Sequence, residues 1–203
     1  NSQPITAAHT MYKQPTRFLA RRITTSTNAF TKNINHRFYT QAKPSNINVI
    51  PQPPITLIDA ETKEPIDTDT LFQKKRVVVF GVPGAFTPVC SSKHVPSYQR
   101  RFEELREKVD EVICVSVNDA HVMAAWRQYL NDHCKDCFPS GKNIKYLADP
   151  SAKFTKQAGL DVDLTGANLG VRSKRYSMIV DNGEVVFLNV EDSPGQFQAS
   201  TAE

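Results

Sequence analysis

One cysteine of this chain, Cys90, lies where an apolar, strand-like run gives way to an amphipathic helical pattern. The run is VVVFGV at 77–82, the connection is PGAFTPVC at 83–90, and the helical pattern covers residues 91–109. A thiol at a helix start lies among backbone N–H groups that have no intrahelical partner, in the positive end of the helix dipole, and both favour the thiolate. The sequence therefore predicts a reactive cysteine at residue 90.

The elements that must position Cys90 alternate along the middle of the chain. Each of three strand-like runs is followed by a helical pattern, which is typical of a parallel sheet covered by helices on both faces. Two further runs flank Asp181-Asn182-Gly183, a strong signal for an antiparallel hairpin. The sequence therefore predicts an α/β chain of the thioredoxin-like fold, with a central mixed sheet flanked by helices. The expected strands are 55–59, 77–82, 112–117, 144–147, 175–180 and 184–190, and the expected helices are 67–72, 91–109, 119–131 and 151–158.

Four blocks of the chain, in this order, resemble the peroxiredoxin-5 or type II peroxiredoxin family. They are PGAFTPVCSSKHVPSY (83–98), CVSVND (114–119), YLADP (146–150) and KRYSMIVDNG (174–183), and the resemblance covers residues 47–203. Members of that family are thiol peroxidases that reduce hydrogen peroxide, alkyl hydroperoxides and often peroxynitrite. The resemblance implies the same hydroperoxide substrates here, with no cofactor, no metal and no haem.

The resemblance also assigns the site residues. The family motif Pro-x-x-x-Thr-x-x-Cys falls on Pro83, Thr87 and Cys90, and the active-site arginine of the family falls on Arg175. Cys90 would attack one peroxide oxygen and become a sulfenic acid, while Arg175 supplies cationic donors for the thiolate and for the leaving oxygen. The Thr87 hydroxyl would accept from the peroxide and donate to the sulfur, and Pro83 would shield the sulfur from water. Val89 stands where the family usually has Gly or Thr, but that position contributes only its backbone.

Each of these residues also has an ordinary structural interpretation. Cys90 could be an inert buried thiol, Thr87 a turn or cap residue, and Arg175 a solvated surface charge. Topology favours the functional role for Arg175, because a strand antiparallel to the others starts at the edge where the parallel strands end, beside Cys90. His94, one turn into the helix, is expected to be structural, since a thiolate stabilised by arginine needs no base.

Three further cysteines are candidates for resolving the sulfenic acid. Some type II relatives use a cysteine aligned with Cys114. Here Cys114 is expected about 10 Å below the active edge, whereas a disulfide needs Cα atoms within about 7 Å, so a buried core residue is the favoured interpretation. Cys134 and Cys137 are expected about 20 Å away, at the far end of the helix 119–131. Their CxxC, next to His133, is a weak zinc or redox motif, and we interpret it as a loop insertion with a local disulfide or an intersubunit contact.

The source of the reducing thiol follows from the resemblance. In animal members the resolving cysteine lies near the C-terminus, at the position of Ala199 here, so that step is absent. Reduction of Cys90 by glutathione with glutaredoxin, or by thioredoxin, is then implied, together with a homodimer. Two other functions stay open. A thiol–disulfide oxidoreductase would require a CxxC at the helix start, and the sequence Ser91-Ser92-Lys93 after Cys90 argues against it. A peroxide sensor or holdase would relay oxidation to partner proteins without turnover.

The first part of the chain differs in charge from the rest. Residues 1–58 hold seven Lys or Arg and no acidic residue, so all 21 acidic residues come later. The net charge of +4 therefore belongs to this segment and does not indicate a nucleic acid partner.

The composition of this segment predicts a mitochondrial presequence. It is rich in Ser, Thr and Asn, and its apolar stretch FLARRI (18–23) has spaced arginines. Arg37-Phe38-Tyr39 predicts cleavage near Tyr39 and Thr40 and import into the matrix, the alternative being a disordered basic arm. We expect residues 1–46 to be a largely disordered presequence and linker, and 47–203 the peroxiredoxin domain. Ser200 to Glu203 resembles a helix start, so that domain is expected to continue beyond Glu203. No apolar run is long enough to span a membrane.

Overall fold

A computed structural model describes residue 47 and residues 49–133 and 144–202. The expected presequence, Cys134 and Cys137 lie outside the described residues. The strands are β1 (Thr56–Asp59), β2 (Pro65–Asp67), β3 (Arg76–Val82), β4 (Glu111–Ser116), β5 (Lys145–Ala148), β6 (Asp161–Asp163), β7 (Val171–Ser173), β8 (Tyr176–Asp181) and β9 (Glu184–Val190). The helices are α1 (Thr68–Phe72), the π-helix η1 (Cys90–His94), α2 (Val95–Arg100), α3 (Phe102–Arg106), α4 (Ala120–His133), α5 (Lys153–Gln157) and the 3₁₀-helix η3 (Thr165–Ala167).

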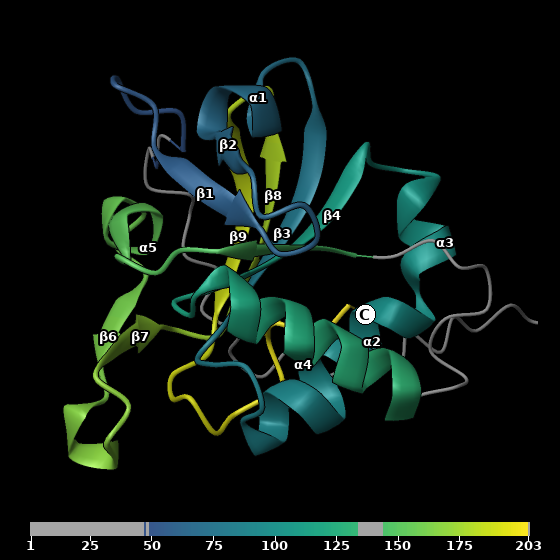
Figure 1. The fold of residues 1–203 in the computed structure, drawn as a ribbon. Coiled ribbons are helices and arrows are strands. Elements are labelled where there is room, and N and C mark those ends of the chain that lie inside the picture. The colour runs from purple at the N-terminus through teal and green to yellow at the C-terminus, as the bar shows by residue number, and fades with distance from the viewer. Residues whose placement is uncertain (1–46, 48, 134–143, 203) are drawn as a thin grey trace, which may run out of the picture. The chain divides into compact units, whose positions relative to one another are not determined.

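A mixed sheet of seven strands forms the centre, in the order β2-β1-β5-β4-β3-β8-β9 (Figure 1). The neighbours β5, β4 and β3 are parallel, whereas β1, β8 and β9 pair antiparallel to their neighbours. The hairpin between β8 and β9 turns at Asn182 and Gly183, both with positive φ. The expected mixed sheet and hairpin are confirmed.

Helices cover both faces of the sheet. Successive side chains of β3 point to opposite faces and pack in two separate hydrophobic clusters, each of which includes helix residues. Val77 and Val79 pack on the face that α1 and α5 cover with Phe72 and Phe154. Val78, Phe80 and Val82 pack on the other face, and the helix side chains there come from α2, α3 and α4: Tyr98, Phe102, Met123, Trp126 and Leu130. Among the described residues, no helix combines the length and the apolar character that a membrane crossing requires.

The expected helix over 91–109 is wrong as a single element. The chain forms η1, α2 and α3 in succession, with an interruption at Arg101, whose φ is −104° and ψ is 10°. Pro96 has no N–H to donate to the carbonyl of Ser92, so an α-helical ladder cannot run through this point. Val95 N–H instead donates to the carbonyl of Cys90, five residues back. The proline was visible in the sequence and marks where the prediction failed.

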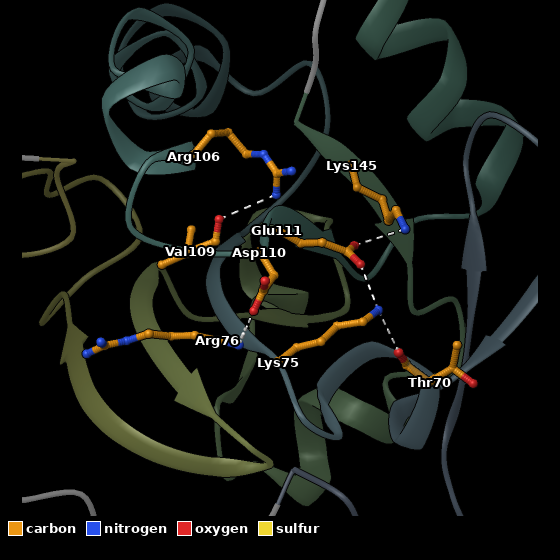
Figure 2. A network of polar contacts seen from close by, with 8 residues as sticks. All are labelled: Thr70, Lys75, Arg76, Arg106, Val109, Asp110, Glu111 and Lys145. Carbon is orange, nitrogen blue, oxygen red and sulfur yellow. Dashed lines mark hydrogen bonds and ion pairs between the residues drawn. The ribbon is translucent and has the colours of Figure 1, made fainter.

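The two edges of the parallel strands have different chemistry. At the edge where these strands start, the Glu111 carboxylate of β4 lies 2.9 Å from Nζ of Lys75 and 2.9 Å from Nζ of Lys145 (Figure 2). Burial opposes ionisation of Glu111, but the bonds from the two lysines hold its pKa below the usual value. This ion-pair network ties the starts of β3, β4 and β5 together. The opposite edge, where β3 ends and β8 begins, carries Cys90 and Arg175.

Candidate active site

The loop after β3 is fixed by hydrogen bonds before it reaches Cys90. The Gly84 carbonyl accepts from Thr87 N–H at 3.4 Å and from the Thr87 hydroxyl at 2.9 Å. The Asn118 side-chain oxygen, just after β4, accepts from Ala85 N–H at 3.0 Å and from Nη1 of Arg172 at 3.3 Å. Asn118 lies within the block CVSVND, but nothing in its type revealed that it holds this loop.

Thr87 differs in one respect from the expectation. Its hydroxyl has one proton, which it donates to the Gly84 carbonyl, so it does not donate to the sulfur of Cys90 in this structure. The lone pairs of the hydroxyl oxygen stay able to accept from a peroxide. Pro83 is buried at the start of the loop.

Cys90 is buried on the first helical turn after this loop. Pro88 and Val89 are already helical, and Ser91 N–H donates to the Thr87 carbonyl at 3.0 Å. Cys90 itself opens the π-helical turn η1, and such turns occur frequently at functional sites. The expected position at a helix start is confirmed, although the turn is wider than that of an α-helix.

Arg175 donates to the sulfur of Cys90 through two nitrogens. It immediately precedes β8, is only 1% exposed, and places both Nη1 and Nη2 at 3.4 Å from Cys90 Sγ. Nη2 also donates to the Pro194 carbonyl at 2.8 Å, and Nη1 lies 3.0 Å from Nδ1 of His94. The surface-charge interpretation of Arg175 is therefore wrong, and the topological argument placed it correctly. A guanidinium in this position stabilises a thiolate and presents donors where charge develops on a reacting oxygen.

His94 is a buried neutral partner of Arg175. A guanidinium can only donate, so Nδ1 must accept, and Nε2 then carries the proton that it donates to the Ser200 carbonyl at 3.0 Å. Burial, and after it the charge of Arg175, lower the pKa of His94 to about 3. The geometry gives His94 a structural role, as expected, because its only basic nitrogen is turned toward Arg175.

The buried His94 makes stability depend on pH. In the unfolded chain the imidazole takes up a proton as the pH falls below its ordinary pKa of 6.5, whereas in the folded chain it stays neutral down to a pKa of about 3. Stability from this group is therefore complete above pH 6.5 and decreases toward pH 3. We compare the free energy of unfolding of the native chain with that of His94→Gln. Between pH 7 and pH 5 we expect the difference between the two to decrease by about 2 kcal/mol. Urea unfolding at both pH values measures this.

A matched replacement tests whether that loss belongs to His94. His121 is exposed on α4, so His121→Gln should keep the pH dependence of the native chain. An equal loss of stability in the native chain and in His94→Gln between pH 7 and 5 contradicts the buried neutral imidazole.

Cys114 lies in the core beneath the site. It is fully buried in β4, opposite Phe80 of β3, and belongs to the same hydrophobic cluster as Cys90. Burial raises the pKa of the Cys114 thiol, and the nearby Cys90 raises it further. Both cysteines are free thiols. A buried neutral thiol is a poor nucleophile, so the geometry agrees with the core interpretation of Cys114.

Sequence reasoning missed the carbonyl groups around Arg175 and one reporter side chain. Pro194 and Ser200 contribute only backbone oxygens, and backbone oxygens have no signature in a sequence. Trp126, the only tryptophan of the chain, donates its ring N–H to the Ser91 hydroxyl at 3.0 Å, next to Cys90.

In the part of the chain that the structure describes, no group of three or more His, Cys, Asp or Glu residues could hold a metal ion.

Comparison with known proteins gives concordant matches. A family model described as Redoxin matches residues 50–203. Peroxiredoxin-2B of Arabidopsis thaliana is 42% identical over 158 residues, which cover 77% of this chain and 92% of that protein. Mitochondrial Peroxiredoxin-2F of Oryza sativa subsp. japonica is 45% identical over 134 residues, which cover 66% of this chain and 64% of that protein. A crystal structure of reduced Prx3 from Vibrio vulnificus in complex with H₂O₂ is 42% identical, with a TM-score of 0.66, and the match covers 78% of this chain and 94% of that one.

Proposed function

This chain belongs to the Redoxin family and, within it, to the peroxiredoxins, and from that membership we propose that Cys90 is its peroxidatic cysteine. As a peroxiredoxin of thioredoxin-like fold it is a thiol-dependent peroxidase. The observation that carries the assignment of Cys90 is the pair of Arg175 nitrogens at 3.4 Å from its sulfur. Thr87 and Pro83 complete the proposed site, with Thr87 as an acceptor for the peroxide O–H and Pro83 as a shield against water.

The proposed reaction oxidises the sulfur by two electrons. The Cys90 thiolate attacks one peroxide oxygen, the O–O bond breaks, and the other oxygen leaves with the electron pair and takes up a proton to become water or an alcohol. Arg175 stabilises the thiolate before the attack and the developing negative charge on the leaving oxygen during it. The product is a Cys90 sulfenic acid. His94 holds the guanidinium and transfers no proton.

The proposed reductant is a thiol from outside the subunit. The first thiol condenses with the sulfenic acid to a mixed disulfide and releases water, and a second thiol releases Cys90. Glutathione with glutaredoxin, or thioredoxin, fits this role, because Cys114 is a buried neutral thiol and Ala199 stands where animal members have a cysteine. A thiol–disulfide oxidoreductase is disfavoured by the serines that follow Cys90, and catalytic rather than stoichiometric peroxide consumption separates the enzyme from a sensor or holdase.

The experiment that tests this function traps the intermediate. After one equivalent of hydrogen peroxide, we expect dimedone to label Cys90 and non-reducing mass spectrometry to find no disulfide that includes it. The reason is that Cys114, the other free cysteine of the described residues, is fully buried in β4, so the sulfenic acid persists until an external thiol is added. Cys114→Ser is the matched control and should label equally. A bridge from Cys90 to Cys114 or to Cys134 contradicts the one-cysteine cycle, and labelling at another cysteine contradicts the assignment of Cys90.

We also propose a mitochondrial location, with residues 1–46 as presequence and linker, cleavage near Tyr39 and Thr40, and residues 47–203 as the peroxiredoxin domain. The acid-free, arginine-spaced composition supports this, and two relatives have mitochondrial in their names.

A homodimer is proposed on the family resemblance. Phe86 is 50% exposed and Tyr129 is 42% exposed, with ring centroids 5.5 Å apart next to the loop of Thr87, which offers a second copy an apolar surface.

A further inference from the structure

The residues after β9 form a strap that leads back to the active site. We define the C-terminal strap as residues 191–202. Its first residue, Glu191, is 7% exposed, and its backbone N–H donates to the Arg175 carbonyl at 2.9 Å. One carboxyl oxygen of Glu191 accepts four hydrogen bonds from the strap: from N–H of Gln198 at 2.7 Å, of Ala199 at 2.9 Å and of Ser200 at 2.9 Å, and from the Ser200 hydroxyl at 2.8 Å.

The turn that Glu191 holds presents two carbonyl groups to the site. The Ser200 carbonyl accepts from Nε2 of His94 at 3.0 Å and from the Tyr98 hydroxyl at 3.1 Å. The Pro194 carbonyl accepts from Nη2 of Arg175 at 2.8 Å. The Phe197 ring contacts the ring of His94, with centroids 5.3 Å apart. Glu191 is thus connected to the Cys90 sulfur through hydrogen bonds of the strap, His94 and Arg175.

The guanidinium depends on these carbonyls. Besides the sulfur, its acceptors are Nδ1 of His94, whose tautomer is set by the Ser200 carbonyl, and the Pro194 carbonyl. Without the strap, a buried cation would lose one acceptor and the orientation of another. A buried charge without partners moves toward water. The two nitrogens would then leave their positions at the sulfur.

We propose that Glu191 is a positioning residue for peroxide reduction: it shapes the C-terminal strap so that the carbonyls of Pro194 and Ser200 orient Arg175 and His94 toward Cys90. This proposal rests on the proposed function, in which Arg175 assists O–O cleavage. Glu191 touches neither sulfur nor substrate and acts only through the strap. A buried carboxyl group with four donors on one oxygen is costly to desolvate, and those bonds offset the cost.

The test compares two reactions of the same thiol. Peroxide reduction needs both the thiolate and an oriented Arg175, whereas alkylation by iodoacetamide needs only an accessible thiolate. Single-turnover peroxide reduction is followed through the fluorescence of Trp126, and alkylation by mass spectrometry. Both are measured over a pH series, and their limiting rate constants at high pH are compared, so that a change in the thiolate fraction does not enter the comparison. For Glu191→Ala we expect the peroxide rate constant to fall about 30- to 100-fold, because displacement of a catalytic group by about 1 Å can cost about 100-fold. We expect the alkylation rate to change at least tenfold less.

Three variants at and beside this position sharpen the result. Glu191→Gln keeps an acceptor oxygen and should stay within about threefold of the native rate. Glu191→Asp withdraws the oxygen by one methylene and should lose an intermediate amount, so it carries the test if Glu191→Ala does not fold. Asp192→Ala removes the neighbouring, exposed carboxyl group and should react like the native chain.

Two outcomes overturn the proposal. One is a native peroxide rate in Glu191→Asp and in folded Glu191→Ala, and the other is an equal fall of the peroxide and alkylation rates, which mere loss of structure produces. A Glu191→Gln variant as slow as Glu191→Ala contradicts the hydrogen-bond argument. Failure of the proposed function is distinct, because then the native chain itself does not react with peroxide at Cys90.

Discussion

Cys90→Ser is expected to lose peroxidase activity completely, with turnover falling more than about 1,000-fold to the background of the assay. A serine hydroxyl is not ionised at neutral pH and has no sulfur to form a sulfenic acid. The hydroxyl is close in size to the thiol and can still accept from Arg175, so the buried site should keep its shape. Hydrogen peroxide consumption with an excess of dithiothreitol measures the change, because this reductant does not depend on a particular protein partner.

The remaining cysteines supply the control for that experiment. Cys134→Ser combined with Cys137→Ser should keep most of the activity, since the proposed cycle uses only Cys90 and an outside thiol. Activity that persists in Cys90→Ser under excess dithiothreitol contradicts the assignment of the peroxidatic residue. Loss of activity in the double variant under the same conditions contradicts the one-cysteine cycle.

The central strand and the hairpin were predictable because burial and turn chemistry leave a pattern in the sequence. The run 77–82 is apolar throughout, as a central strand covered on both faces must be, and the Asn182-Gly183 turn identifies the hairpin. From these elements alone, an antiparallel strand had to begin where the parallel strands end. Arg175, just before that strand, therefore lies next to Cys90.

The contacts that orient the site were not predictable, because most of them use backbone groups. Pro194 and Ser200 act through their carbonyls, and the Gly84 carbonyl accepts the hydrogen bond that the Thr87 hydroxyl was expected to donate to the sulfur. His94 was expected to be structural, but its link to Arg175 depends on how far the π-helical turn rotates it. That turn follows from Pro96, whose missing N–H the helical pattern concealed.

The contact of Arg175 with Cys90 predicts the second large effect. Arg175→Gln should lower the second-order rate constant for hydrogen peroxide about 100- to 1,000-fold, the usual range when a donor to a developing oxyanion is removed. The amide can still donate a hydrogen bond, but it carries no positive charge, so it stabilises the thiolate and the charge on the leaving oxygen less than the guanidinium does. Arg175→Lys keeps the charge but lacks the planar fork that reaches the sulfur, the Pro194 carbonyl and His94 together. Its rate constant should therefore lie between those of the native chain and of Arg175→Gln. Stopped-flow fluorescence of Trp126 measures all three.

Lys174→Gln removes a neighbouring cation that contacts the Gly159 carbonyl at 3.4 Å and not the sulfur, and it should react at the native rate. Because Arg175→Gln leaves the Pro194 carbonyl and Nδ1 of His94 without their cationic donor, urea unfolding must first show that each variant is folded at the assay temperature. A folded Arg175→Gln within tenfold of the native rate would mean that the guanidinium at the sulfur is structural. In that case the donors for the leaving oxygen must come from the backbone N–H groups of the first helical turn, since the Thr87 hydroxyl already donates its only hydrogen bond to the Gly84 carbonyl.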